Sequence, residues 1–147
     1  MTIGKLLGID HGDARIGVAV CDGLRMVARE LTIVERESDA VDFARLNKIA
    51  GEENVVGIVI GLPVDHDAPP DDDRETQAQR VQAWAATFAE TTRLPIRFYD
   101  EQLSSEDAKI IARRKKRHVR AHIDDLAARV ILQRYLDAVR DGLAESL

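Results

Sequence analysis

The amino-acid sequence predicts an α/β fold in which five strands form one mixed sheet with helices on both faces. Two observations lead to this prediction. Three apolar, largely β-branched stretches follow one another near the N-terminus, separated by short polar turns. After them, segments of helical and of strand periodicity alternate, which gives the element order βββαβαβαα. A chain of 147 residues is typical of one domain, so residues 1–147 are expected to form a single domain.

The first three strands are expected at residues 5–10, 15–20 and 31–34. The first strand is apolar at nearly every position, as in a central strand that is covered on both faces. A turn of residues 11–14 joins it to the second strand, so the two should form an antiparallel hairpin. The third strand follows through another short turn and continues the antiparallel arrangement.

The first helix is expected around residues 41–49, where apolar residues recur at helical spacing. Ser38 or Asp39 is a plausible N-cap for this helix, and Gly51 is a plausible C-terminal stop. The residues expected to face the sheet are Val41, Ala44 or Phe43, Leu46 or Asn47, and Ile49.

The second half of the chain alternates between strands and helices. Because strands reached through helical crossovers usually run parallel to a neighbour, the last two strands should be parallel. The helix at 74–92 should face the sheet through Ala78, Val81, Ala85, Phe88 and Ala89. The expected elements are a strand at 55–60, an acidic loop at 65–73, the helix at 74–92, a strand at 96–100, a helix opened by 104–107, and a last helix from Asp124 to about residue 140.

Composition limits the classes of function. The formal net charge of −5 argues against a protein that binds nucleic acid over its whole surface, so any such binding must use a local basic patch. The only cysteine, Cys21, cannot pair within the chain and is expected to be a small apolar residue at a strand end. We see neither a signal peptide nor a membrane span, and a cytoplasmic location is the expectation.

Three carboxylates stand where elements of this fold begin or end. Asp10 ends the first strand, Glu101 follows the last strand, and Asp124 opens the last helix. The carboxyl ends of neighbouring parallel strands meet at one edge of a sheet, so these groups can come together there. Clustered carboxylates repel one another unless a cation is bound, and hard divalent ions prefer oxygen ligands. The pattern therefore predicts a site for Mg²⁺ or Mn²⁺.

Each of these acids also has an ordinary structural interpretation. Asp10 could simply form a turn, Glu101 could mark the polar end of a strand, and Asp124 could be only an N-cap. Asp125 competes with Asp124, but Asp124 is in line with the apolar stripe of the last helix, whereas Asp125 lies near Arg129 and solvent. The stripe consists of Ala127, Ala128, Ile131 and Tyr135.

Four stretches of the chain resemble the motifs of the YqgF family, in the same order. They are residues 8–20 (GIDHGDARIGVAV), 58–63 (IVIGLP), 99–105 (YDEQLSS) and 123–132 (IDDLAARVIL). Members of this family are described as pre-16S rRNA nucleases, or Holliday-junction-resolvase-like proteins, with an RNase H-like fold. The resemblance covers nearly the whole chain and implies that Asp10, Glu101 and Asp124 are the catalytic and metal-binding residues.

The activity implied by the resemblance is metal-assisted hydrolysis of phosphodiester bonds, with Mg²⁺ or Mn²⁺, in the processing of the 5′ end of pre-16S rRNA. The sequence departs from the family pattern in two places. Gln102 stands where the motif has arginine, which removes one cation near the site. The loop at 65–73 is acidic and contains proline, where the family usually has a glycine. Both departures concern substrate choice and turnover rather than fold.

A basic stretch precedes Asp124. No acid occurs from Lys109 to His122, which is a strong local asymmetry in an acidic chain. It is either a solvated helix end or an arm that follows phosphates, and the lack of aromatic residues excludes base stacking by this arm. The residues expected to contact nucleic acid are Arg15, Arg113, Arg114, Lys115, Lys116, Arg117 and Arg120.

Several alternatives stay open at this point. The turn at Asp10, His11 and Gly12 also resembles the phosphate-binding turn of actin-like kinases, although those proteins use two such domains. A Holliday-junction-resolvase-like DNA nuclease, and a nucleic-acid-binding or regulatory module with little catalysis, are further alternatives. His11 could move a proton, but a turn or surface role is favoured. RNA is favoured over DNA as the partner, and the sequence leaves open endonuclease or exonuclease action and monomer or homodimer.

Overall fold

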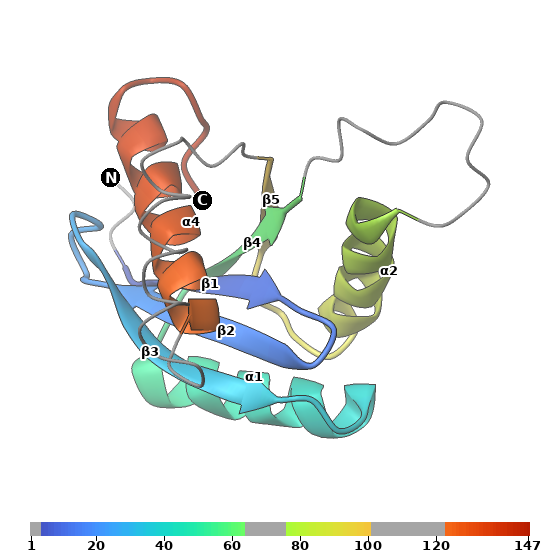
Figure 1. Ribbon diagram of the computed structural model, residues 1–147. Helices are drawn as coiled ribbons and strands as arrows, with labels where there is room; N and C mark the ends of the chain where they lie inside the picture. The colour runs from blue at the N-terminus through green and yellow to red at the C-terminus, as the bar shows by residue number, and fades with distance from the viewer. Residues whose placement is uncertain (1–3, 64–75, 101–122) are drawn as a thin grey trace.

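The computed structural model describes residues 4–63, 76–100 and 123–147. Five strands form one mixed sheet in the order β3-β2-β1-β4-β5 (Figure 1). The strands are β1 (Leu6–His11), β2 (Arg15–Cys21), β3 (Ala28–Glu35), β4 (Gly57–Leu62) and β5 (Ile96–Asp100). Strand β2 pairs antiparallel with both β1 and β3, whereas β1, β4 and β5 run parallel. The predicted topology of the sheet is therefore confirmed.

Helices cover both faces of the sheet, as expected (Figure 1). The helices are α1 (Asp39–Glu53), α2 (Gln77–Ala89) and α4 (Ile123–Arg140). Because side chains alternate along a strand, the sheet supports two separate cores. Leu7 and Ile9 of β1 pack with α1 and α2 on one face, whereas Leu6 packs with α4 on the other. Among the described residues, no helix is long and apolar enough to cross a membrane.

The edge strand β3 is twice as long as the sequence predicted. Only residues 31–34 were expected, but the strand pairs with β2 from Cys21 opposite Ala28 to Arg15 opposite Glu35. The additional residues include Arg29 and Glu30, whose charges are typical of an exposed edge strand. Their polarity hides the strand in the sequence, because the apolar pattern covers only its centre.

Helix α1 begins as predicted but ends later. The side chain of Ser38 accepts a hydrogen bond from the Val41 amide and is the N-cap, which decides between the two predicted caps. The predicted stop at Gly51 is wrong, because the helix continues to Glu53. Asn54 ends it in the left-handed conformation with φ 55°, which asparagine tolerates better than most residues.

Gly51 therefore lies inside a helix rather than at its end, and this position is testable. A Cβ added at Gly51 would meet no atom within 4 Å. Alanine is more favourable than glycine by roughly 0.8–1.0 kcal/mol in a helix interior. We expect Gly51→Ala to raise the free energy of unfolding by about this amount, measured by urea denaturation. A loss of stability would show that the position needs glycine, as a C-terminal stop does.

The buried faces of the first two helices differ in part from the prediction. In α1, Val41 and Ala44 are exposed, whereas Phe43 and Leu46 are buried. Helix α2 was expected from residue 74 to 92, but Thr76 is its N-cap and forms a capping box with Gln79, so it begins at Gln77. The residues that α2 buries are Val81, Trp84, Ala85 and Phe88, so the expected Ala89 is wrong and Trp84 is added.

The remaining sequence predictions divide into confirmed and untested ones. Cys21 is buried at the end of β2, where its Sγ lies 3.2 Å from the Leu6 amide, as expected of a small buried residue. The last helix spans Ile123–Arg140, close to the predicted 124–140. The acidic loop at 65–73 and the helix expected from 104–107 lie outside the described residues.

Candidate active site at the carboxyl ends of the parallel strands

The three parallel strands end together at one edge of the sheet. Ile9 of β1 is in register with Ile60 of β4, which is in register with Phe98 of β5. Asp10 directly follows Ile9, at the same level of the sheet. Glu101 is the residue after Asp100, with which β5 ends, but it lies outside the described residues. The strand register thus brings Asp10 and the point where the chain enters Glu101 to the same edge.

Asp10 lies on the face of the sheet that α4 covers. Side chains two residues apart in a strand share a face, and Leu6, on the face that Asp10 shares, packs against α4. At Gly8 the helix approaches the strand closely: an added Cβ would lie 2.7 Å from Leu132 Cβ and 3.2 Å from the Ala128 carbonyl oxygen. Asp10 is half-buried beside this contact.

The direction of α4 brings its first turn towards Asp10. Leu6, at the start of β1, shares a cavity wall with Tyr135 and Leu136, whereas Gly8 contacts Leu132 and Ala128. The helix therefore runs opposite to β1. Asp124 is the second residue of α4 and precedes Ala128 by one turn. Its backbone is thus on the side of Ala128 that faces the end of β1.

The apolar stripe predicted for the last helix does face the sheet: three of its four residues are buried and the fourth is half-buried. Ala128, Ile131 and Tyr135 are buried against the sheet, and Ala127 is half-buried. Arg129 forms an ion pair with Glu30 of β3, at 3.7 Å. The side chains of Asp124 and Asp125 lie outside the description, so the choice of Asp124 over Asp125 stays a prediction.

A cavity of about 140 Å³ opens at this edge, between the strand ends and the helices α2 and α4. Its apolar wall includes Leu62, Pro63, Ala127 and Ile131. Its polar or aromatic side chains are those of Asp10, His11, Gln77 and Tyr99. Among the described residues that line it, none is lysine or arginine. Asp10 thus lines a partly open cavity large enough for part of a ligand.

His11 is a buried residue rather than the turn or surface residue favoured from the sequence. It is the last residue of β1, and its ring lies 4.6 Å from that of Trp84. Burial lowers the pKa of His11, and the nearby Arg36 guanidinium lowers it further. Both effects favour the neutral form of this imidazole, which lies in the wall of the cavity. Its burial follows from strand alternation, which puts it on the same face as Ile9.

Arg36 ties the turn after β1 to the rest of the fold, a role that the sequence did not reveal. It donates a hydrogen bond to the Gly12 carbonyl oxygen at 3.2 Å, and its Nε lies 3.6 Å from Asp42. Asp42 is fully buried and also accepts a hydrogen bond from the Glu37 amide. The only signal in the sequence was an acid, Asp42, among the apolar residues of a helix. This network holds the turn that directly follows the candidate site.

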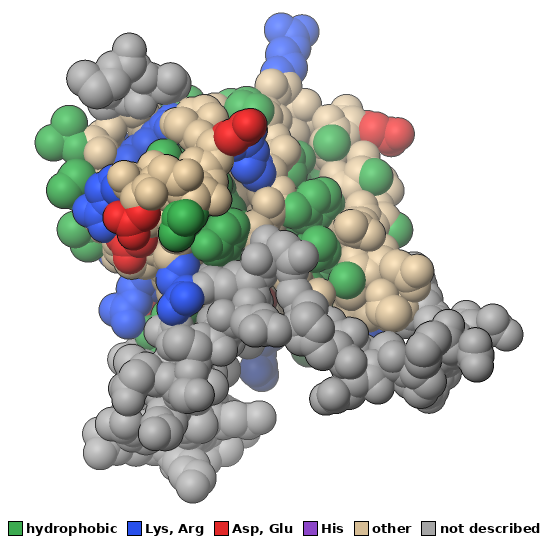
Figure 2. Space-filling view, turned by 90° about the horizontal axis from the view of Figure 1, so that it is seen from above, with side chains coloured by type: hydrophobic (Ala, Val, Ile, Leu, Met, Phe, Trp, Pro, Cys, Tyr) green, Lys and Arg blue, Asp and Glu red, His purple; other side chains and the backbone are tan. Residues whose placement is uncertain are grey.

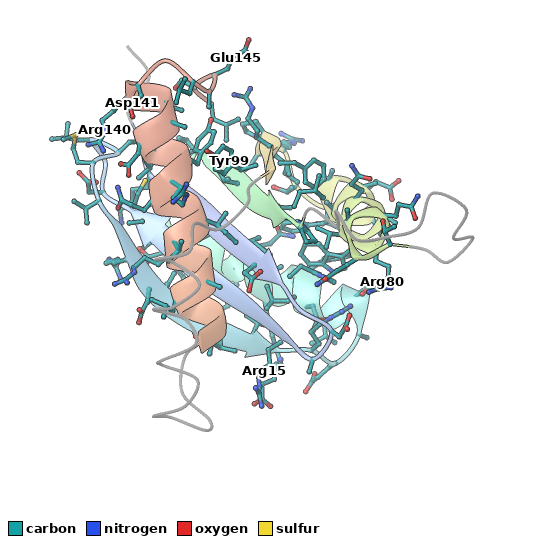
Figure 3. The ribbon with its side chains drawn as sticks, turned by 45° about the horizontal axis from the view of Figure 1, so that its top comes forward. Arg15, Arg80, Tyr99, Arg140, Asp141 and Glu145 are labelled. Carbon is teal, nitrogen blue, oxygen red and sulfur yellow. The ribbon has the colours of Figure 1, made fainter. Side chains whose placement is uncertain are left out.

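Arg15, one of the predicted nucleic-acid contacts, begins β2 beside that turn. Its side chain is about half exposed and lies 4.0 Å from Glu35, and Figure 3 shows it pointing away from the sheet. The other predicted contacts, from Arg113 to Arg120, lie outside the described residues. On the face seen in Figure 2, the described cations are interspersed with acids and apolar side chains and form no patch of one sign.

Within the described part of the chain, no group of three or more His, Cys, Asp or Glu side chains is placed to hold a metal ion. Of the three predicted ligands, only the side chain of Asp10 is described. Its position fits an oxygen ligand, because it is a half-buried carboxylate in a cavity wall beside the start of α4 and the end of β5.

Comparison with known sequences identifies relatives along nearly the whole chain. The family described as RuvX, Holliday junction resolvase, matches residues 4–138. A relative from Crocosphaera subtropica named "Putative pre-16S rRNA nuclease" is 39% identical over 93% of this chain and 95% of its own length. A protein of the same name from Cereibacter sphaeroides is 40% identical over 91% of this chain and 83% of its own.

Solved structures share the fold at low sequence identity. T. thermophilus RuvC in complex with a Holliday junction substrate superposes with a TM-score of 0.62 and 14% identity, over 98% of this chain and 99% of that one. The Holliday junction resolvase of fowlpox virus superposes with a TM-score of 0.50 and 10% identity, over 91% of this chain and 99% of that one. These similarities establish an RNase H-like fold, as expected. Together with the match over residues 4–138, they show that this chain belongs to the RuvX family of Holliday-junction-resolvase-like proteins.

Proposed function

We propose that this protein is a divalent-metal-dependent nuclease that hydrolyses phosphodiester bonds, with the 5′ end of pre-16S rRNA as its substrate. The observation that carries the proposal is the edge of the sheet where Asp10, the exit of β5 and the first turn of α4 approach one another beside a cavity. The family description and the names of the relatives support a nuclease. The same names favour rRNA as the substrate.

Asp10, Glu101 and Asp124 are the proposed ligands of Mg²⁺ or Mn²⁺ and the proposed catalytic residues. Three carboxylates from three elements form an oxygen donor set of the kind that these hard ions take. When bound, the ion would lower the pKa of a water molecule and neutralise charge on the phosphate. The chain contributes a fixed position for Asp10, because the end of β1 is held by its strand neighbours and by the Arg36 network.

Nucleic-acid binding is proposed for Arg15 and for the basic stretch Arg113, Arg114, Lys115, Lys116, Arg117 and Arg120. Arg15 is exposed at the same end of the sheet as Asp10. The basic stretch ends shortly before Asp124 in the sequence, and α4, which carries Asp124, begins beside the proposed site. Cations that contact phosphates position a strand without reading its sequence. We place the protein in the cytoplasm, where an rRNA-processing enzyme meets its substrate.

Branched DNA is the second candidate substrate. It is favoured by the family description and by the structural similarity to RuvC, which was solved with a Holliday junction substrate. Both substrates present a phosphodiester backbone, so the same carboxylates could serve either. The two candidates differ in whether cleavage needs a 2′-hydroxyl and an RNA strand or a four-way junction.

The experiment that tests the proposal is a cleavage assay on a panel of labelled substrates. The panel contains a pre-16S rRNA 5′ segment, the same sequence as single-stranded DNA, and a synthetic four-way DNA junction. We expect cleavage of the RNA with Mg²⁺ or Mn²⁺, and no cleavage in EDTA or with Ca²⁺, whose looser coordination positions water poorly. Cleavage of the junction alone would make DNA the substrate. Cleavage in EDTA would contradict the proposed metal dependence.

The basic stretch gives a further prediction. Each phosphate contact contributes roughly 0.7–0.9 to the slope of log affinity against log salt concentration. Replacing Arg114, Lys115 and Lys116 by alanine should therefore reduce the magnitude of this slope by about 2–3. Fluorescence anisotropy with Ca²⁺ in place of Mg²⁺ measures the slope without cleavage. Lys48→Ala, which removes an exposed cation of α1, is the control and should leave it unchanged. An unchanged slope in the triple variant would make the stretch only a solvated helix end.

A further inference from the structure

The cavity beside Asp10 has a chemical character that the cleavage of a phosphodiester bond does not require. Four apolar side chains form much of its wall, and none of the described residues that line it carries a positive charge. The metal proposed at Asp10 would hold the phosphate at that side of the cavity, whereas the apolar side chains offer nothing to replace the hydration of a charged group. A neutral group with flat apolar faces and polar edges fits this wall. Within a nucleic acid, that group is the nucleobase.

We propose that this cavity takes up one unstacked nucleobase of the substrate strand, next to the bond that is cut. The proposal rests on the function proposed above and names a structural requirement of its substrate. A base can enter a pocket of this kind only if it is unpaired and turned out of the stack. The protein would thus select unpaired or distorted segments of nucleic acid rather than regular duplex.

Tyr99 is the residue on which the base is proposed to stack. It lines the cavity from β5, and Figure 3 shows it between α4 and the strands. Tyr135 holds its ring edge-on, with ring centroids 5.7 Å apart and planes at 71°. Tyr135 is itself buried and donates a hydrogen bond to the Glu145 carbonyl oxygen at 2.6 Å. The Tyr99 ring is therefore fixed before a ligand arrives, which reduces the entropy lost on binding.

The other walls complete a pocket for one base. Ala127 and Ile131 close it on the α4 side, and His11 closes the end next to Trp84. Gln77, exposed in the first turn of α2, offers a carboxamide with two donors and an acceptor for the polar edge of a base. The capping box of Thr76 and Gln79 fixes the start of this helix, and hence the position of Gln77.

The test uses oligonucleotides in which one nucleotide lacks its base. A set of single-stranded RNAs with the sequence of the pre-16S rRNA 5′ segment carries an abasic residue at each position in turn. Affinity is measured by anisotropy with Ca²⁺, and cleavage is measured with Mg²⁺. Stacking of a base on an aromatic ring typically changes affinity by roughly 5- to 150-fold. We expect one abasic position to weaken binding to wild-type protein by a factor in this range, with small effects elsewhere.

Variants connect that sensitivity to the cavity. Ala127→Met fills the space from α4 and should make the protein bind intact and abasic RNA about equally. Tyr99→Leu removes the stacking surface from a different element and should give the same result, which guards against a local folding defect in either variant. Ala44→Met adds the same side chain at an exposed position of α1 and should keep the full wild-type sensitivity. Thermal unfolding of each variant checks that the fold is intact.

The outcomes separate this proposal from the proposed nuclease function. If every abasic RNA binds like the intact one, or if both cavity variants keep the wild-type sensitivity, the base pocket is wrong even when cleavage is observed. If one abasic position weakens binding and the cavity variants abolish that effect, the pocket stands. It then stands even if no RNA is cleaved, and only the nuclease proposal fails.

Discussion

Replacement of Asp10 by asparagine is expected to abolish metal-dependent cleavage while the protein stays folded. The substitution keeps the size of the side chain but removes the charge that attracts a divalent ion. Loss of a residue that only supports a metal ligand typically costs roughly 10- to 100-fold in affinity or activity, and loss of a ligand should cost more. Because clustered carboxylates repel one another without metal, the free energy of unfolding should be unchanged or slightly higher.

Asp13→Asn is the matched control for this experiment. Asp13 lies three residues further along, exposed in the turn between β1 and β2, so the variant changes the same charge near the same site. We expect it to cleave like wild type. Cleavage rates and Mn²⁺ affinity by isothermal titration calorimetry would be measured for both variants, with urea denaturation for stability. Full activity of Asp10→Asn would contradict the three-carboxylate site. An equal loss of cleavage in Asp13→Asn would show only a general electrostatic effect.

The second large effect is expected at Gly8, where α4 touches β1. A Cβ at this position would lie 2.7 Å from Leu132 Cβ and 3.2 Å from the Ala128 carbonyl oxygen, so the helix itself must move. Overpacking of a core usually costs 1–3 kcal/mol, and we expect Gly8→Ala to destabilise the protein by about this amount. Since α4 carries Asp124, displacement of the helix should also reduce cleavage strongly, even where the protein remains folded.

Two other glycines provide a graded comparison. At Gly61 an added Cβ would lie 2.5 Å from Ile131 Cδ1, the far end of a flexible side chain, so Gly61→Ala should cost less than Gly8→Ala. At Gly23 it would meet no atom within 4 Å, and Gly23→Ala should be close to neutral. Urea denaturation of the three variants measures this order. A Gly8→Ala protein as stable as wild type would mean that α4 does not sit on β1 as described.

Much of the sheet could be predicted because the apolar pattern of a strand reflects how many of its faces are buried. The first strand is apolar at most positions, since it is central and covered by α4 on one side and by α1 and α2 on the other. The length of the edge strand β3 was underestimated because one side of this strand faces solvent, where charged residues such as Arg29 and Glu30 are tolerated. Periodicity therefore predicts central strands better than edges. The same reason explains why the end of α1 was misplaced: Asn54 takes a conformation that glycine is more often expected to supply.

The sequence by itself determined the family of this protein, its fold class and the order of the elements that the structure describes. Asp10 at a strand end, the matching motifs and the alternation of strands and helices were enough to predict an RNase H-like fold. Only the tertiary structure decided what surrounds Asp10, His11 and the turn that follows them. The residues around this site come from different parts of the chain: His11, Arg36, Trp84, Tyr99 and Ala127. They come together because of the strand register and because α4 packs closely against Gly8. Contacts between residues far apart in the chain cannot be predicted from periodicity, because the periodicity of a segment reflects only the helix or strand that the segment forms.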